Sequence, residues 1–240
     1  EKLGNLREEG KAHTVAGICG SSSGSVAGLM ERFLTAYGST GFFTPASPED
    51  TFSFSHIQHQ DKKTVPGFDL ENADYVLSFG AGIIDGWGSP VRMILANSKW
   101  KTDHIKLVQD DPRQSNTAAK ADQWLACKPG TEAILALGIA YVILRESLYD
   151  QTAIDYHSEG FKTWSSRVLA SYHPDKVAEM TGIDAQVIIA IGREFGRAAK
   201  PIAVWGRGEG RTPVSVAEMS AIHALNVLAG NINKPGGVYT

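Results

Sequence analysis

The residues best suited to chemistry lie in one stretch, residues 105–132, where two short apolar runs each end in charged or turn-forming residues. The run at residues 105–108 is followed by the sequence DDPR at residues 110–113. The run at residues 124–127 is followed by KPGTE at residues 128–132, and a long apolar helix pattern begins there. Strand, turn and helix N-terminus in this order are typical of open α/β sheets that bind nucleotides at the carboxyl ends of their strands.

This pattern predicts a site for an anionic ligand. The first turn of a helix leaves backbone N–H groups unpaired, and these favour a phosphate or pyrophosphate. Asp111 follows its strand directly and is placed to accept hydrogen bonds from a ribose or a guanine edge. Each motif also has an ordinary structural reading. Thr131 or Glu132 is a good helix cap, and Asp-Pro-Arg is a common turn.

Secondary structure was predicted from hydrophobic periodicity and turn residues. Strands are expected over residues 13–19, 75–79, 105–108, 124–127 and 201–205, and residues 42–67 read as a long loop. Helices are expected over residues 25–37, 90–97, 131–146, 153–156, 161–171, 174–180, 185–199 and 214–228. Strands that alternate with helices predict parallel βαβ units.

Composition excludes several classes of protein. The 240 residues carry a net charge of −3, which gives no electrostatic basis for binding nucleic acid. No apolar run approaches the roughly 20 residues of a membrane-spanning helix. Two cysteines, Cys19 and Cys127, are too few for a disulfide framework or a metal cluster and are read as buried thiols.

Five segments in the same order resemble the molybdopterin oxidoreductases, the dimethyl sulfoxide reductase family. They are ADYVLSFGAG at residues 73–82, the DPR to PGTE stretch, YHPDKVAEMTGI at 172–183, PIAVWG at 201–206 and LAGNINKPGG at 228–237. The loop at residues 80–88 departs from the Asn-Pro that is usual there. It looks more like the subgroup related to polysulfide reductases and quinone-coupled complexes.

The resemblance implies an α/β fold of two Rossmann-like, three-layer lobes with parallel sheets. Residues 1–68 and 159–240 would form one split α/β domain, with strands 13–19 and 201–205 in it. Residues 69–158 would form an inserted dinucleotide-binding-like domain. The chain would be the central part of the pterin-binding catalytic subunit of a membrane-associated bacterial oxidoreductase of anaerobic respiration.

The implied cofactor is molybdopterin guanine dinucleotide, two copies of which hold molybdenum or tungsten in the whole protein. The cofactor-binding residues implied are Gly20, Ser21, Ser22, Gly80, Ala81, Gly82, Asp111, Arg113, Lys128, Pro129, Gly130, Thr131, Glu132, Gly206 and Arg207. For Gly206 and Arg207 two readings stay open: they face pterin or phosphate oxygens, or they form a tight turn with a solvated arginine.

The resemblance also implies partners and a location outside this chain. An iron–sulfur cluster is expected in a region N-terminal to it, and an iron–sulfur electron-transfer subunit and a membrane anchor subunit in the intact complex. The complex would lie on the periplasmic side of the cytoplasmic membrane or, alternatively, in the cytoplasm. The 240 residues alone are expected to hold no cofactor.

The metal ligand is where the sequence departs from the family. Family members place a Cys, selenocysteine, Ser or Asp on the metal, and the corresponding stretch here, residues 41–55, has no cysteine. Asp50 is the candidate ligand of this stretch, with an exposed turn carboxylate as the other interpretation. The departure supports an alternative function, a non-catalytic structural or electron-relay homologue that has lost the metal.

Overall fold

The computed structural model describes residues 1–20, 24–45, 47, 51, 66–208 and 214–240, and the chain divides into two units, residues 1–50 and 51–240. The N-terminal unit contains helix α1 (Lys2–Glu8), strand β1 (Ala16–Ile18), helix α2 (Ser25–Tyr37) and strand β2 (Gly41–Phe43). Strands β1 and β2 are parallel, with Ala16 opposite Gly41. Helix α2 has the predicted bounds and ends at Gly38, whose φ of 105° only glycine adopts readily.

The second unit is built on a four-stranded sheet with the strand order β6-β5-β4-β7, in which every pair is parallel. Its strands are β3 (Gly67–Phe68), β4 (Tyr75–Ala81), β5 (Lys106–Asp110), β6 (Gln123–Leu125), β7 (Pro201–Gly208) and β8 (Val238–Tyr239). Its helices are α4 (Pro90–Asp103), α5 (Asn116–Lys120), α6 (Glu132–Arg145), α7 (Gln151–His157), α8 (Phe161–Ser171), α9 (Pro174–Thr181), α10 (Ala185–Arg197) and α11 (Val216–Leu228). Strands β3 and β8 form a separate antiparallel pair.

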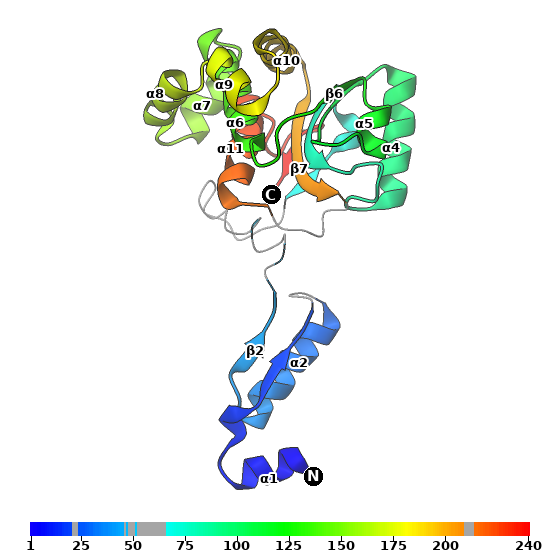
Figure 1. The fold of residues 1–240 in the computed structure, drawn as a ribbon, viewed down its shortest axis with the longest axis vertical. Coiled ribbons are helices and arrows are strands. Elements are labelled where there is room, and N and C mark those ends of the chain that lie inside the picture. The colour runs from blue at the N-terminus through cyan, green and yellow to red at the C-terminus, as the bar shows by residue number, and fades with distance from the viewer. Residues whose placement is uncertain (21–23, 46, 48–50, 52–65, 209–213) are drawn as a thin grey trace. The chain divides into compact units, whose positions relative to one another are not determined.

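Strand β4 runs through the middle of the sheet, and all seven of its residues are buried. A strand covered on both faces reads as a continuous apolar run, which is the pattern of parallel sheets. Helices α4 and α5 lie on one side of the sheet, and α6 and α11 lie on the other (Figure 1). Helices α8, α9 and α10 pack in turn against α6. The predicted α/β class with parallel sheets is confirmed.

Helix α4 is longer than the sequence predicted. It continues past Asn97 to Asp103 because Trp100, which is 2% exposed, packs into the core and donates a hydrogen bond from its indole nitrogen to the carbonyl of Leu70 at 2.8 Å. Strand β1 is shorter than predicted, because residues 12–14 form a 3-10 turn.

The strand at residues 201–205 lies in one sheet with residues 75–81 and not, as the expected split domain requires, with residues 13–19. This strand, β7, pairs in parallel with β4, with Tyr75 opposite Pro201. The carboxylate of Asp74 accepts hydrogen bonds from the backbone N–H groups of Ala199 and Lys200, which fixes the two strand starts side by side. Residues 159–240 share one hydrophobic core with residues 69–158, so the expected boundaries at 68 and 159 do not separate units here.

Within the described residues, none of the helices combines the length and apolar character that crossing a membrane requires.

Candidate functional site

The carboxyl ends of the four parallel strands bring ionisable residues together at one edge of the sheet. Asp110 is the last residue of β5, Cys127 follows β6, and Arg207 lies near the end of β7. Helix α6 begins with Glu132, and Glu218 lies in the first turn of α11. These five residues are referred to below as the carboxyl-edge cluster.

Arg207 is the cation of this cluster. Its Nη2 donates to Oε2 of Glu218 at 2.7 Å and lies 3.3 Å from Oε1 of Glu132. Its Nη1 donates to the carbonyl of Gly206 at 3.0 Å. The two glutamates are only 4% and 7% exposed, so two buried carboxylates share one guanidinium. The reading of Arg207 as a solvated side chain in a tight turn is therefore wrong, because residues 206 and 207 belong to β7 and the arginine is ion-paired.

The cluster keeps unused hydrogen-bond acceptors. Both carboxylate oxygens of Asp110, Oε2 of Glu132 and Oε1 of Glu218 are buried and accept no hydrogen bond within the part of the chain that the structure describes. Buried polar atoms are nearly always paired in folded proteins. Unpaired acceptors at the carboxyl ends of the strands therefore favour either binding of a ligand that donates hydrogen bonds or protonation of a carboxylate.

Burial controls the ionisation of the cluster. Burial raises the pKa of Asp110 to about 7, and the nearby carboxylates of Glu132 and Asp111 add to this effect, whereas the thiol of Cys127 and the charge of Arg207 oppose it. Burial also raises the pKa of the Cys127 thiol, which stays protonated. The pKa of Glu218 is raised by burial, and its ion pair with Arg207 offsets only part of that effect.

The last two residues of β4, Gly80 and Ala81, lie close against β7, and Gly82 follows them. Gly80 has φ of 66°, and a Cβ there would lie 2.8 Å from the carbonyl oxygen of Gly206 and 3.0 Å from Nη1 of Arg207. The carbonyl of Ala81 accepts hydrogen bonds from Oγ of Ser78 and Nε2 of Gln109. Close approach of β4 and β7 thus explains the need for glycine at position 80, and the three predicted loop residues are buried.

The predicted residues of the two turns lie nearer the surface. Asp111 is 8% exposed, and its Oδ1 accepts a hydrogen bond from the backbone N–H of the exposed Arg113 at 3.2 Å. Lys128 is exposed and donates from Nζ to the carbonyl of Glu179 at 3.0 Å, at the C-terminal end of α9. Its ammonium has three donors, so this contact leaves others available.

Thr131 does not cap helix α6. Its hydroxyl donates to the carbonyl of Lys128 at 2.6 Å, and its side chain makes no cap hydrogen bond to the first turn of the helix. Pro129 and Gly130 are exposed beside it, and Gly130 has φ of 83°. The backbone N–H groups at the start of α6 therefore stay available to an anion.

The remaining predicted residues are not part of this cluster as described. Gly20 is exposed in the N-terminal unit, after β1. Ser21, Ser22 and Asp50 lie outside the described residues. Among the residues that are described, no group of three or more His, Cys, Asp or Glu side chains is arranged to hold a metal ion.

Asp85 stabilises the same edge from the next loop. Its carboxylate accepts hydrogen bonds from Nδ2 of Asn116 at 2.7 Å and from the backbone N–H and hydroxyl of Thr117 at 3.0 and 2.7 Å. Burial opposes ionisation of Asp85, but these hydrogen bonds outweigh it and lower its pKa.

Asp85→Ala is expected to lower the free energy of unfolding by about 1–2 kcal/mol at neutral pH, because helix α5 loses a side-chain cap. Urea unfolding measures the loss. Since the folded pKa is lowered, the contribution is present above the ordinary pKa of Asp and disappears as the pH falls through the folded value. An equal difference between wild type and variant in strong acid and at neutral pH would contradict this account.

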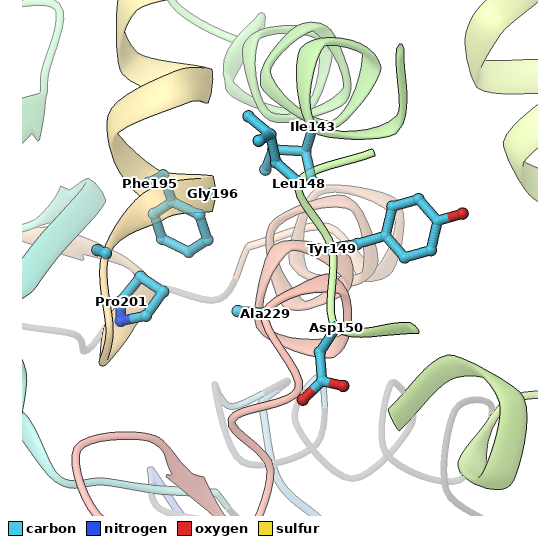
Figure 2. A pocket seen from close by; sticks show the side chains of 9 residues that line it. Ile143, Leu148, Tyr149, Asp150, Phe195, Gly196, Pro201 and Ala229 are labelled. Carbon is cyan, nitrogen blue, oxygen red and sulfur yellow. The ribbon is translucent and has the colours of Figure 1, made fainter. Parts of the chain in front are cut away.

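A pocket of about 250 Å³ lies at the opposite edge of the sheet, where β7 begins at Pro201. Figure 2 shows its lining, with Ile143 at one end and the carboxylate of Asp150 at the other. That carboxylate accepts from the backbone N–H of Ala153 at 2.9 Å and pairs with Lys234 at 3.4 Å. None of the predicted site residues lines this pocket, and the carboxyl-edge cluster remains the candidate site.

Sequence reasoning did not assign Asp110, Cys127 and Glu218 of the cluster to the site, and it also missed Asp85 beside the cluster. Asp110 stands next to Asp111, and their position after an apolar strand signals that one of the two points inward. Glu218 lies three residues after Ser215, a spacing typical of a helix capping box. Its backbone N–H does bond to Oγ of Ser215, but its carboxylate binds Arg207 instead.

Open α/β proteins place their ligand sites at the carboxyl ends of parallel strands, which is where the cluster lies in this sheet. The family model for molybdopterin oxidoreductases matches residues 1–240, and the chain belongs to that family.

Known relatives agree with this assignment. The chain is 30% identical, over 98% of its length, to the menaquinone reductase, molybdopterin-binding-like subunit of Nitratidesulfovibrio vulgaris. It is 32% identical, over 72% of its length, to the arsenate respiratory reductase molybdopterin-containing subunit ArrA of Shewanella sp.. It covers 33% and 23% of these two proteins, so it spans at most about a third of their length.

A solved structure supports the fold. Acetylene hydratase from Pelobacter acetylenicus superposes with a TM-score of 0.74 over 99% of this chain and 32% of that protein. The sequence identity is 24%, so this likeness is evidence for the fold alone.

Proposed function

We propose that the carboxyl edge of the β6-β5-β4-β7 sheet binds the guanine nucleotide end of a molybdopterin guanine dinucleotide cofactor. The observation that carries the proposal is the set of buried carboxylates with unused acceptor oxygens at this edge. Membership of the family supports a pterin cofactor, and the position of the cluster supports its nucleotide end as the part bound here.

The residues present fit the chemistry of such a group. A guanine edge and ribose hydroxyls are hydrogen-bond donors, and we propose Asp111 and Glu132 as their acceptors. Phosphate oxygens need donors and positive charge, which the exposed Arg113, Lys128 and the uncapped start of helix α6 supply. Gly80 lies close to Nη1 of Arg207, and residues 80–82 are proposed to act through the position of that side chain.

For the whole protein, we propose that this chain is the central part of the pterin-binding subunit of a membrane-associated respiratory oxidoreductase. The pterin-bound molybdenum or tungsten supplies the redox chemistry, and the protein supplies binding, orientation and electrostatics. We further propose that the longer protein carries an iron–sulfur cluster N-terminal to these residues and assembles with an iron–sulfur subunit and a membrane anchor subunit. The proposal includes membership of the quinone-coupled subgroup and a periplasmic location, with the cytoplasm as the alternative.

A non-catalytic relay homologue is the second candidate. Residues 41–55 contain no cysteine, and the relative at 30% identity is itself described as molybdopterin-binding-like. Metal analysis of the longer protein separates the two functions: molybdenum or tungsten at one atom per molecule supports the oxidoreductase, and its absence from protein that retains pterin supports the relay.

The nucleotide site is tested by Asp111→Ala in the longer protein. Loss of a charge-assisted hydrogen bond costs about 1.5–3 kcal/mol, or roughly 10- to 150-fold in affinity. We expect less guanine nucleotide per molecule after purification, with Asp103→Ala on helix α4 as a surface control that retains it. Nucleotide retained equally by Asp111→Ala and wild type would exclude the assignment.

The 240-residue chain alone is proposed to fold without metal or pterin and to show no redox turnover. Its second unit has its own hydrophobic core, so folding does not depend on the cofactor. A ligand of this size held along one sheet edge lacks the enclosure that typical cofactor sites provide. Metal and pterin analysis of the purified chain tests this, and a molybdenum-bearing, active chain would contradict it.

A further inference from the structure

We propose that the side chain of Asp110 carries a proton in the folded protein, and that this proton keeps Arg207 bound to Glu132 and Glu218. The proposal concerns the protein without a ligand and does not depend on which cofactor binds. It gives the carboxyl edge a built-in response to pH.

The first argument is the burial of Asp110, beside which the thiol of Cys127 is only a weak hydrogen-bond donor. The residue has no exposed surface, and neither carboxylate oxygen accepts a hydrogen bond within the described ranges 66–208 and 214–240. An ionised carboxylate in such a place loses its hydration without compensation, which favours the neutral acid. A buried group in this position takes up a proton instead.

The second argument is the balance of charge around Asp110. The charged and titratable groups that act on Asp110 are Asp111 after β5, Cys127 after β6, Glu132 on α6 and Arg207 on β7. Glu218 on α11 acts on it indirectly, because it forms an ion pair with Arg207. One guanidinium thus faces four carboxyl groups. Its polar contacts within the described residues go to Glu132, Glu218 and the carbonyl of Gly206, and neither oxygen of Asp110 accepts a hydrogen bond from it.

The thiol of Cys127 does not supply the missing charge. Burial raises its pKa, so it is neutral, and a thiol is only a weak hydrogen-bond donor. Burial raises the pKa of Asp110 to about 7 even with this thiol beside it. The proton is therefore held up to about neutral pH and released above it.

Release of the proton changes the ion pairs. An ionised Asp110 competes for Arg207, and the contact to Glu132, at 3.3 Å, is longer than the one to Glu218, at 2.7 Å. The Glu132 contact is the one that we expect to lengthen. Because Nη1 of Arg207 lies against Gly80, we expect movement of Arg207 to alter the environment of residues 80–82.

The direct test is a nuclear magnetic resonance titration of the 240-residue chain with isotope-labelled aspartate carboxyl carbons. We expect one aspartate to titrate near neutral pH while the others titrate in acid. The Asp110→Asn variant identifies that resonance by its disappearance, and Asp103→Asn on α4 leaves it in place. If all aspartates of the wild-type chain titrate in acid, the proposal is wrong, whether or not the variants fold.

Stability gives an independent measurement. The folded pKa of Asp110 lies above the ordinary 3.8, so the unfolded chain releases this proton first as the pH rises. Stability therefore falls between about pH 4 and about pH 7 and is flat above that range. Between about pH 5 and pH 8, the unfolding constant of wild type should rise on the order of 100-fold more than that of Asp110→Asn. Identical pH profiles would overturn the proposal.

Discussion

Replacing Arg207 by methionine is expected to lower the free energy of unfolding of the second unit by about 3 kcal/mol, the low end for a broken buried ion pair. The low end applies because the Arg207 side chain is 31% exposed, whereas its partners Glu132 and Glu218 are buried. Without the guanidinium, two buried carboxylates lose their counter-charge. Urea unfolding at neutral pH, followed by circular dichroism, measures the change.

The controls separate charge from volume. Arg207→Lys keeps the positive charge but not the planar guanidinium that binds two carboxylates and the Gly206 carbonyl. Its loss of unfolding free energy should therefore be smaller than that of the methionine variant. Adding Glu132→Gln and Glu218→Gln to Arg207→Met removes the uncompensated charges and should recover much of the stability. A methionine variant as stable as wild type would show that the ion pairs contribute nothing to folding.

Asn226→Ala is expected to lower the free energy of unfolding by about 3–5 kcal/mol, which is the second of the two large effects. The fully buried amide of Asn226 accepts from the backbone N–H of Ala203 at 2.9 Å and donates to its carbonyl at 2.8 Å. It also accepts from Nδ2 of Asn231 at 3.1 Å. The truncation leaves a buried donor and a buried acceptor of β7 unpaired, at about 1–3 kcal/mol each, and adds a cavity.

Asn97→Ala is the matched control, since this asparagine is only half-buried on helix α4 and should change stability by no more than about 0.5 kcal/mol. Urea unfolding gives the free energies, and hydrogen exchange at the Ala203 amide reports on the strand itself. Slow exchange at Ala203 in the Asn226→Ala variant would mean that another group satisfies this N–H.

Local patterns predicted the helices well because local interactions determine them. Helices α2 and α8 begin and end at the predicted residues. Helix α10 buries Ile188, Ile191 and Phe195 at helical spacing, and Asp184 caps it. Helix α5 was missed: five residues are too few to show a period, and its start depends on Asp85 from another loop.

The pairing of β7 was not predictable in the same way. The apolar run at residues 201–205 shows that the strand is buried, but it carries no information about its neighbour. The neighbour depends on contacts remote in sequence, such as those of Asp74 with residues 199 and 200. The segment LAGNINKPGG was recognised by resemblance without a role. In the structure its Asn231 donates to the carbonyl of Pro201 at 2.5 Å and so holds the outer edge of β7.

The sequence pointed to the same region as the cluster in the structure, but only to some of its residues. The strand ends and the start of α6 marked the edge of the sheet where the cluster lies. Of the neighbouring acids, the sequence favoured Asp111, whereas Asp110 is the one with no exposed surface. Side chains alternate along a strand, so a shift of one residue decides which acid points inward. Burial and unpaired oxygens become visible only in three dimensions.

The adjacency of β4 and β7 has a consequence for how the chain folds as it is made. Strand β4 pairs with β5 soon after both have left the ribosome, but its other neighbour comes only after residues 82–200. Closing so long a loop is slow, because its entropy is lost before any contact is gained. Until β7 has been synthesised, a strand that is buried along its whole length in the finished fold presents an open edge to other nascent chains, the kind of surface that chaperones bind and from which aggregates grow.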